Sequence, residues 1–442
     1  MTGNVRALLN DLYDAAVSAA HPATCLPPHL PSPPHDGRLI VLAVGKAAAA
    51  MAVAAEGHYR LLGALDRLQG LATAPHGYTA TLGVKPERLE ILEGRHPTPD
   101  ASSRSAAERA IALARMAGDR DLVLVLLSGG ASSLWAAPAP GLELADKTAL
   151  TRGLLKCGAD IHEMNTVRRH LSRIKGGRLR QAATGATMLT LAISDVPGDD
   201  PQTIGSGPTV PDPTTLADAR AVIQRRKERM LQLGLPIPAA VLASLQDPAN
   251  ETPKPGGPAF AHSDFRIIAT PQMALAAAGE LARARGYDVI DLQDRITGEA
   301  ADVACSHAAL ARQAKADGRR VAIISGGELE VTVRNKAGRG GRSQEYALAL
   351  ALALSGAPGI AALAADTDGI DGGEGVLDPA GALVLPDTLG RAQARHLNAQ
   401  IFLDNNDATP FFAALDDLVV RGPTHTNVND FRVILVDPKD GP

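Results

Sequence analysis

The chain has 442 residues, of which 45% are apolar and 21% are charged, and its formal net charge is −4. This length predicts two or three domains, and the composition excludes a wholly disordered chain. The small net charge argues against a protein that coats nucleic acid or an anionic membrane. No run of about 18 uninterrupted apolar residues is present for a membrane span. Three scattered cysteines predict reduced thiols in a cytoplasmic protein, and neither a disulfide framework nor a zinc site.

The first half of the chain alternates between helical and strand patterns. Residues 4–20 predict an amphipathic helix, and the six prolines of 21–37 predict an extended surface connection. Apolar runs bounded by turn residues predict strands buried on both faces at 39–44, 122–127 and 188–194. Helical patterns lie between them, at 47–56, 102–117 and 144–159. Such alternation predicts a mainly parallel, doubly wound sheet, whose ligands bind beyond the carboxyl ends of the strands.

Proline and glycine accumulate between Leu233 and Pro258, where we place a boundary between domains 1–235 and 236–442. Strands are predicted after it at 265–270, 287–292, 321–328 and 360–366, and helices at 272–285, 297–315 and from the GRGGRSQE segment onward. The alternating LEVTV segment (329–333) predicts a half-exposed antiparallel strand. The glycine turn SGG follows a strand at 128 and again at 325, which suggests similar architecture in both halves.

Two glycine turns at strand ends could hold an anion. Lys46 follows the first strand and Gly45, where a cation beside free helix N–H groups can bind a phosphate oxygen. The alternative is a surface lysine on an alanine-rich helix. The SGGASS turn (128–133) combines glycines that admit a ligand with three hydroxyl groups. Its alternative is an ordinary tight turn with a helix cap.

Charged loops supply the remaining candidates. The GRGGRSQE segment (338–345) places Arg339 and Arg342 at a helix start, where guanidinium groups could bind carboxylate or phosphate. Asp195 and Asp368 follow buried strands and could bind a hard cation, although solvated loop acids are the alternative. His96 and His425 are interpreted as structural. Neither a GxxxxGK[ST] loop nor a GxGxxG turn with an acid about twenty residues on is present.

Nine motifs carry a resemblance to a known family: AVGKAAAAM, GRHPTPD, LLSGGASSLW, NTVRRHLSRIKGGRLR, ISDVPGDDPQTIGSGPTVPD, SGGELEVTV, GRGGRSQE, AADTDGIDG and THTNVNDF, in this order. Over about Leu8 to Leu435 the chain resembles the glycerate 2-kinases with a C-terminal MOFRL domain. The resemblance implies a Rossmann-like N-terminal domain, a smaller α/β C-terminal domain with its MOFRL region at about 320–435, and a cleft between the two. It also implies phosphorylation of D-glycerate to 2-phosphoglycerate by ATP, with Mg²⁺.

The resemblance also implies roles for individual residues. Lys46 and Arg342 match the residues regarded as catalytic in the family. Candidate phosphate- or substrate-binding residues are Ser128, Gly129, Gly130, Ser132, Ser133, Lys175 and Gly341, and Asp195 and Asp368 are the metal candidates. The chain departs from the family pattern in SGGASS, where a more glycine-rich SGGGS is usual, and at His425, where glycine is frequent.

Three functions remain open from the sequence. Besides the kinase, the second function is a hydroxypyruvate reductase, the name that some family members carry, and this activity would require NAD(P)H. The third is a module that binds a nucleotide without turning it over. The missing dinucleotide fingerprint favours the kinase. The expected partners are small molecules, D-glycerate and ATP, and not nucleic acid or membrane; assembly into a homo-oligomer is left open.

Overall fold

A computed structural model of the protein describes residues 2–373 and 375–438. It divides into two compact units, which we call the central unit (Cys25–Ile268) and the terminal unit (Met1–Thr24 with Ala269–Pro442). This division differs from the expected limits of 1–235 and 236–442. The proline- and glycine-rich stretch lies inside the central unit, because the strand after it joins the central sheet. No helix within the described residues is long and apolar enough to cross a membrane.

The central unit contains a six-stranded sheet in the order β3-β2-β1-β4-β5-β6. The pairs β3-β2, β2-β1, β1-β4 and β4-β5 are all parallel. Every residue of β1 and β4 is buried, as expected for strands with helices on both faces. The strands are β1 (Leu39–Val44), β2 (Leu68–Pro75), β3 (Leu89–Gly94), β4 (Leu122–Leu127), β5 (Thr187–Ile193) and β6 (Ser263–Ala269). The predicted Rossmann-like sheet is confirmed, and its order reverses between β1 and β4.

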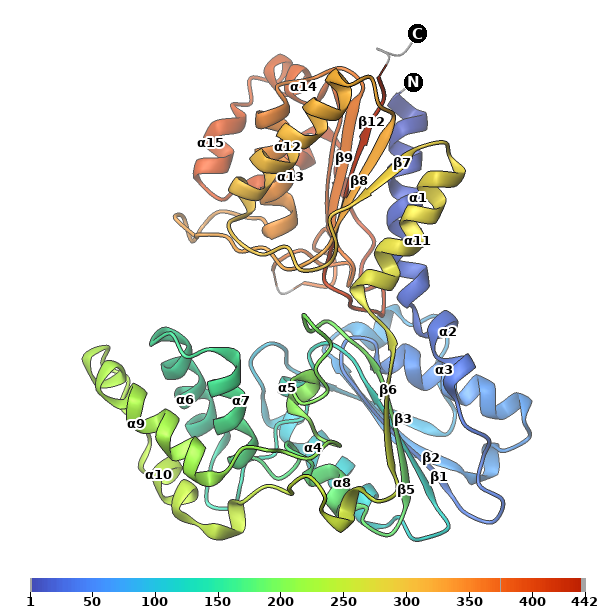
Figure 1. The fold of residues 1–442 in the computed structure, drawn as a ribbon, viewed down its shortest axis with the longest axis vertical. Coiled ribbons are helices and arrows are strands. Elements are labelled where there is room, and N and C mark those ends of the chain that lie inside the picture. The colour runs from blue at the N-terminus through green and yellow to red at the C-terminus, as the bar shows by residue number, and fades with distance from the viewer. Residues whose placement is uncertain (1, 374, 439–442) are drawn as a thin grey trace. The chain divides into compact units, whose positions relative to one another are not determined.

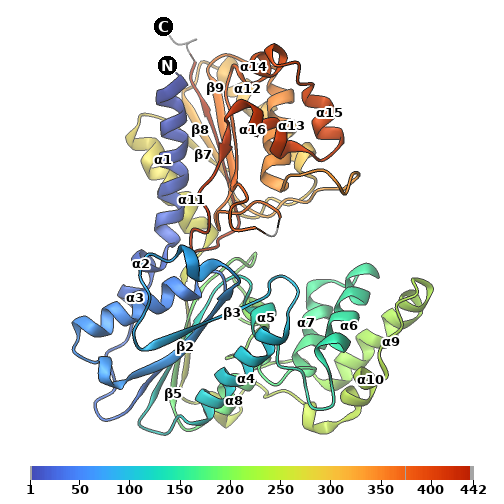
Figure 2. The ribbon, with the colours of Figure 1, turned by 180° about the vertical axis from the view of Figure 1, so that it is seen from behind.

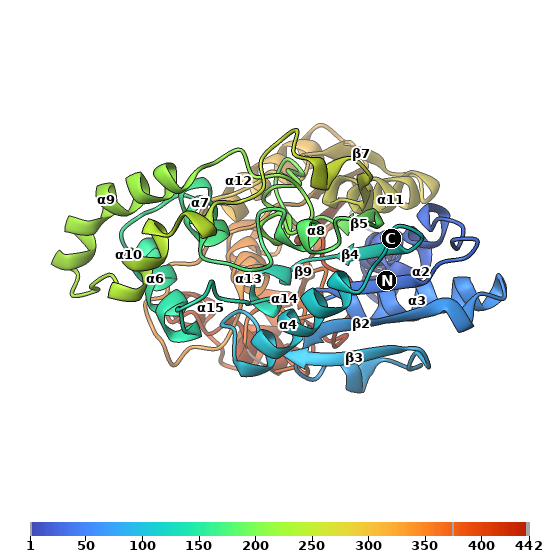
Figure 3. The same cartoon turned by 90° about the horizontal axis from the view of Figure 1, so that it is seen from below.

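Helices surround this sheet and also form a separate layer beside it (Figures 1 and 3). The helices next to the sheet are α3 (Ala48–Leu61), α4 (Ala101–Arg115), α5 (Ala131–Leu134) and α8 (Arg178–Ala182). The short helix α2 (Pro22–Cys25) begins in the terminal unit and ends at the first residue of the central unit. The separate layer, here called the helical arm, contains α6 (Leu144–Lys156), α7 (Ile161–His170), α9 (Leu216–Gln232) and α10 (Ala239–Gln246). The arm has an apolar core of its own, which includes Leu154, Val167, Val222 and Leu245.

The connection at 21–37 is not wholly extended, contrary to expectation. Its first half forms α2 and the 3-10 helix η1 (Pro27–His29), and Cys25 and Leu26 are buried. Proline is compatible with the first turn of a helix, so a high proline content does not exclude short helices. The other 3-10 helices are η2 (Leu65–Arg67), η3 (Tyr78–Thr81), η4 (Ile204–Ser206), η5 (Pro248–Asn250) and η6 (Pro258–Phe260).

The terminal unit contains a second six-stranded sheet, in the order β11-β10-β9-β12-β8-β7. Only the β7-β8 pair is parallel, whereas the other four pairs are antiparallel, so the repeated SGG turn does not reflect similar architecture in the two halves. The strands are β7 (Asp288–Asp291), β8 (Val321–Ser325), β9 (Ile360–Asp366), β10 (Gly381–Val384), β11 (Leu418–Val419) and β12 (Asp430–Val436).

Helices cover both faces of the terminal sheet (Figures 1 and 2). Helices α1 (Thr2–Ala20) and α11 (Pro271–Ala284) pack together on one face, and the Tyr13 hydroxyl donates to the Asp366 carbonyl oxygen at 2.8 Å. The first helix of the chain therefore packs with the last third of the sequence. The remaining helices are α12 (Ala300–Ala316), α13 (Arg342–Leu354), α14 (Thr388–Ala394), α15 (Ala399–Asp404) and α16 (Ala408–Leu415).

The LEVTV segment is not a strand, although its alternation predicted one. Within it the structure has only an isolated parallel bridge between Glu330 and Glu299. Its three apolar side chains, Leu329, Val331 and Val333, line a cavity instead of facing a neighbouring strand. The alternation therefore reflects one wall of a cavity and not the pleat of a sheet.

Candidate active site

Lys46 lies where the strand order of the central sheet reverses. Val44 at the end of β1 pairs with Leu127 at the end of β4, so the turns after both strands are adjacent. The Lys46 amide donates to the Gly129 carbonyl oxygen at 2.8 Å, and the Ala47 amide donates to Ser128 Oγ at 3.0 Å. These bonds join the Lys46 turn to the SGGASS turn. In open α/β sheets this reversal is where ligands bind.

Gly45 is required at this junction. Its φ of +123° is rarely adopted by other residues, and a Cβ there would lie 2.2 Å from Ser128 Oγ. We expect Gly45→Ala to lower the free energy of unfolding by on the order of 2–4 kcal/mol, because strain and clash add. Denaturant unfolding would measure this loss. Gly57→Ala is the control: it lies in α3 with nothing within 4 Å of a new Cβ, so it should stabilise by about 0.5–1 kcal/mol. Equal effects of both changes would contradict the prediction.

His96, which the sequence analysis interprets as structural, lies at the same junction. A Cβ on Gly130 would lie 2.9 Å from His96 Cδ2, so the ring lies directly against the SGGASS turn. Burial lowers the pKa of His96 to about 4, and the positive charge of Lys46 contributes. The ring is therefore neutral at pH 7. We call Lys46, His96 and the SGGASS turn the lysine site; only the GRHPTPD motif pointed to His96.

The hydroxyl groups of the SGGASS turn differ in their roles. Ser128 Oγ is buried, accepts from Ala47 and donates to the Val44 carbonyl oxygen at 3.3 Å, while Ser133 Oγ donates to the Gly130 carbonyl oxygen at 2.9 Å. Both hydroxyls therefore stabilise the turns. Ser132 is different, because its Oγ accepts from Lys175 Nζ at 2.9 Å. The predicted candidates Ser132 and Lys175 are thus in direct contact.

Lys175 lies near two further cations, neither of which was singled out from the sequence. These are Lys147 on α6 and Arg168 on α7, and we call the three residues the cation cluster. Burial lowers the pKa of Lys175 well below its ordinary value, and the charges of Lys147 and Arg168 lower it further. Burial also lowers the pKa of Lys147 to about 7, with a contribution from Arg168. The sequence does not show that the three cations lie together, because their proximity depends on how the helical arm packs.

The low pKa of Lys147 predicts a pH-dependent stability. Its nearest acidic neighbours along α6 do not neutralise it, since Glu143 pairs with Arg104 and Asp146 accepts from the Glu143 amide. Between pH 7 and the ordinary lysine pKa, the unfolded chain binds a proton that the folded chain does not. The free energy of unfolding contributed by this residue therefore rises with pH across that window.

We expect Lys147→Met to stabilise the ligand-free protein below pH 7 by on the order of a few kcal/mol. The gain should shrink as pH rises above 7 and disappear near the ordinary lysine pKa. Urea denaturation at several pH values would measure it. Lys156→Met, at the exposed end of the same helix, should show no such trend. A gain for Lys147→Met that does not change with pH would refute the titration argument.

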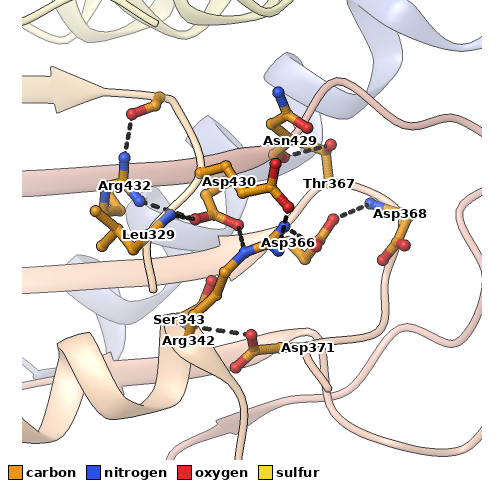
Figure 4. A network of polar contacts seen from close by, with 12 residues as sticks. Leu329, Arg342, Ser343, Asp366, Thr367, Asp368, Asp371, Asn429, Asp430 and Arg432 are labelled. Carbon is orange, nitrogen blue, oxygen red and sulfur yellow. Dashed lines mark hydrogen bonds and ion pairs between the residues drawn. The ribbon is translucent and has the colours of Figure 1, made fainter. Parts of the chain in front are cut away.

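Arg342 is the first residue of α13 and is surrounded by carboxylates (Figure 4). Its Nε donates to Asp430 Oδ1 at 2.7 Å, its Nη2 to Asp366 Oδ2 at 2.9 Å, and its Nη1 to Glu328 Oε1 at 2.8 Å. Burial opposes the charge on Arg342, but Asp430, Asp366 and Glu328 outweigh it and hold its pKa above the ordinary value. We call these four residues the arginine site.

Asp430 links Arg342 to a second arginine. Its Oδ2 accepts from Arg432 Nη1 at 3.0 Å, and its side chain is fully buried. Burial raises the pKa of Asp430, and the two guanidinium groups oppose this rise. Strands β9 and β12 pair through Asp366 and Asp430, which places both carboxylates at one edge of the sheet. Asp430 lies in the THTNVNDF motif but was not singled out from the sequence.

The start of α13 is fixed by a carboxylate from a distant loop. Asp371 accepts from the Ser343 amide at 3.0 Å and from the Gln344 amide at 2.8 Å, so it caps the helix that carries Arg342. Gly341 is needed beside it, because a Cβ would lie 2.2 Å from the Asp371 carbonyl oxygen. Burial raises the pKa of Asp371 to about 7, although the amide bonds oppose the rise. Gly341 therefore leaves room for this cap, and its role as a binding residue stays a prediction.

A cavity of about 340 Å³ adjoins the arginine site within the terminal unit. One wall is apolar and includes Leu329, Val331 and Val333. The glycine-rich loop before α13 and the Arg342 side chain form much of the rest. The cavity thus combines an apolar wall with a cation, as small-molecule sites usually do.

The two metal candidates lie in different units. Asp195 follows β5 in the central sheet, and Asp368 follows β9 in the terminal sheet, where its Oδ1 accepts from the Ile370 amide at 2.8 Å. Across residues 2–373 and 375–438, no three His, Cys, Asp or Glu side chains are placed to hold a metal ion together. Each of the two aspartates therefore remains a prediction as a single ligand.

Comparisons with known proteins agree with this architecture. A model of the domain of unknown function DUF4147 matches residues 8–244, and a model of the MOFRL family matches residues 321–430. The chain is 34% identical over 437 residues to the D-glycerate 2-kinase of Thermotoga maritima, covering 98% of this chain and 99% of that protein.

Two further comparisons cover almost the whole chain. A crystal structure of a glycerate kinase from Thermotoga maritima matches with a TM-score of 0.84 at 32% identity, covering 98% of this chain and 100% of that one. A protein of Agrobacterium vitis that carries the provisional name hydroxypyruvate reductase is 45% identical over 438 residues, 98% of this chain and 95% of that protein.

Proposed function

Because the chain belongs to the glycerate 2-kinase family with DUF4147 and MOFRL domains, we propose that it phosphorylates D-glycerate on its 2-hydroxyl with ATP. The observation that carries the proposal is the position of Lys46, hydrogen-bonded through its backbone to the SGGASS turn at the reversal of strand order. Phosphoryl transfer needs positioned reactants and neutralised charge more than covalent chemistry. A lysine on a rigid turn can fix the position of a phosphate group and neutralise part of its charge.

Lys46 and Arg342 are the proposed catalytic residues. Each cation would stabilise negative charge on the transferring phosphoryl group. The side chain of Arg342 is oriented by three carboxylates before any substrate binds, so little reorganisation is needed at the moment of reaction. His96 stays neutral beside Lys46 and would keep that region free of a competing positive charge.

Magnesium enters the proposal as part of the nucleotide substrate. Mg²⁺ in kinases usually keeps several waters and binds substrate phosphates with one or two carboxylates. This requirement fits a chain whose described residues lack a cluster of three ligands. Asp195 and Asp368 are the carboxylates that we propose as single ligands. When bound, the ion would neutralise phosphate charge.

A reductase acting on hydroxypyruvate is the second candidate, favoured by the name of the Agrobacterium vitis relative. Its weakness is the first turn of the central sheet. The segment after β1 reads GKA, which lacks the GxGxxG pattern that brings a dinucleotide pyrophosphate against a helix N-terminus.

Free Cys25, Cys157 and Cys305 support the proposed cytoplasmic location of the enzyme.

One pure sample decides between the two activities. The kinase predicts ADP release that requires both D-glycerate and Mg²⁺, with 2-phosphoglycerate identified by ³¹P NMR. The reductase predicts oxidation of NADH or NADPH by hydroxypyruvate without ATP. NAD(P)H oxidation without glycerate-dependent ADP release would overturn the proposal, and 3-phosphoglycerate as product would overturn the assigned position.

A further inference from the structure

We propose that Lys147, Arg168 and Lys175 form an oxyanion subsite that takes a phosphate group of the nucleotide. The subsite itself depends only on the central unit, whereas the identity of its ligand as a nucleotide rests on the proposed function. The members come from three places: α6, α7 and the loop that follows α7.

The first observation is that these cations have no carboxylate partners. Within the described residues, neither Lys147, Arg168 nor Lys175 forms an ion pair. Lys147 Nζ is buried and makes no hydrogen bond. An unpaired buried ammonium is costly, and a bound oxyanion would offset that cost.

Cations elsewhere in the same region are neutralised. Arg169, next to Arg168 in the chain, pairs with Asp212 at 2.9 Å, and Arg226 on α9 pairs with Glu163 at 2.5 Å. His170 contacts Glu251 at 3.1 Å. The lack of ion pairs in the cation cluster is therefore a local property and not a general feature of the helical arm.

The second observation is the contact between the cluster and the SGGASS turn. Lys175 Nζ donates to the Ser132 carbonyl oxygen at 2.6 Å as well as to Ser132 Oγ. Ser132 Oγ also contacts Ser206 Oγ at 3.0 Å, and Ser206 Oγ donates to Asn165 Oδ1 at 3.2 Å. This chain of hydroxyl groups can turn to donate to an oxyanion.

The position and charge of the cluster favour phosphate over a single carboxylate. The SGGASS turn is bonded on one side to the Lys46 turn and on the other to Lys175, so the subsite shares this turn with the lysine site. A phosphate dianion would favour the protonated forms of Lys147 and Lys175 beside Arg168, and so matches the subsite better than one carboxylate charge. Arg168 and Ser132 are half-buried, which leaves the subsite open to solvent on one side.

The test uses inorganic pyrophosphate and D-glycerate as separate probes of the full-length protein, by titration calorimetry at low ionic strength and pH 6.5. We expect Lys147→Met and Arg168→Gln each to weaken pyrophosphate binding by about 10- to 100-fold, with D-glycerate binding changed less. Lys147→Arg should retain pyrophosphate binding. The matched control Lys156→Met removes one positive charge from the same helix and should bind like the wild type.

Kinetics gives a second readout. The same substitutions should raise KM for ATP more than KM for D-glycerate. Unchanged pyrophosphate affinity in both folded variants would overturn the subsite. A loss of affinity for D-glycerate alone would overturn the assignment of the subsite to phosphate. If the wild type releases no ADP but Lys147→Met still loses pyrophosphate, the subsite stands and the kinase proposal fails.

Discussion

Replacing Arg342 with alanine is expected to lower kcat by on the order of 10²-fold or more, with much smaller changes in KM. The guanidinium group is held in place by Asp430, Asp366 and Glu328 before substrate binds. A cation oriented in advance stabilises charge that develops in the transition state, so its loss should appear in kcat. Steady-state kinetics with varied ATP and D-glycerate measures both constants. A change confined to KM would contradict the catalytic role.

The same substitution also has a structural cost that must be separated from catalysis. Asp430 is fully buried and Asp366 nearly so, and both would lose a cationic partner. Breaking a buried ion pair costs about 3–5 kcal/mol, although Arg432 still faces Asp430. Thermal unfolding must therefore show that Arg342→Ala is folded at the assay temperature. Arg342→Lys keeps a charge but loses the three-way hydrogen bonding, so we expect intermediate activity.

Arg339 provides the matched control for Arg342. It lies in the same glycine-rich segment, three residues earlier, and it is exposed. Its backbone amide donates to Asp407, a contact that substitution with alanine keeps. Arg339→Ala should therefore leave kcat within about twofold of the wild type. An equal loss in both variants would show that the segment as a whole, and not the Arg342 guanidinium, carries the effect.

Burial helped the prediction of strands but did not decide it, because the fully buried β10 and β12 were not predicted and the partly exposed β6 and β7 were. LIVLAV and LVLVLL became β1 and β4, because a strand covered on both faces has no polar positions to obscure its pattern. Strand β3, with the sequence LEILEG, is partly exposed and was not predicted. The LEVTV segment shows the opposite error, since its alternation lines a cavity and not a sheet.

The domain limits depended on packing that a local pattern does not contain. Helix α1 has an ordinary amphipathic sequence, yet its Tyr13 contacts Asp366 and Phe431, more than 350 residues away. Nothing near residue 13 specifies that partner. The proline- and glycine-rich stretch predicted a boundary, but β6 returns afterwards to the central sheet.

Candidate residues were found where a turn carries its own signature. Lys46, Ser132 and Arg342 lie in glycine-rich turns next to strand or helix ends, a context that the sequence displays directly. Lys147 and Asp430 were missed for the same physical reason. Each is polar in a segment that looks ordinary, and each becomes notable only through neighbours far along the chain.

Replacing Lys46 with methionine is expected to lower kcat by on the order of 10²-fold, because the transferring group loses a cation at the reversal of strand order. Folding should survive, since the bonds that join the two turns come from the Lys46 backbone and from Ser128. Lys85→Met removes one positive charge from an exposed loop of the same unit and serves as the control.

The pKa of His96 can be measured independently of catalysis. Burial is the main cause of its low pKa and the Lys46 charge is the second, so Lys46→Met should raise the His96 pKa from about 4 while leaving it below the ordinary value. Titration of the ring by NMR would measure this change, and an unmoved pKa would show that the Lys46 ammonium does not face the ring.

The double variant of Lys46 and Arg342 completes the test. If both cations act on one transition state, the fold-loss of kcat in the double variant should be well below the product of the fold-losses in the two single variants.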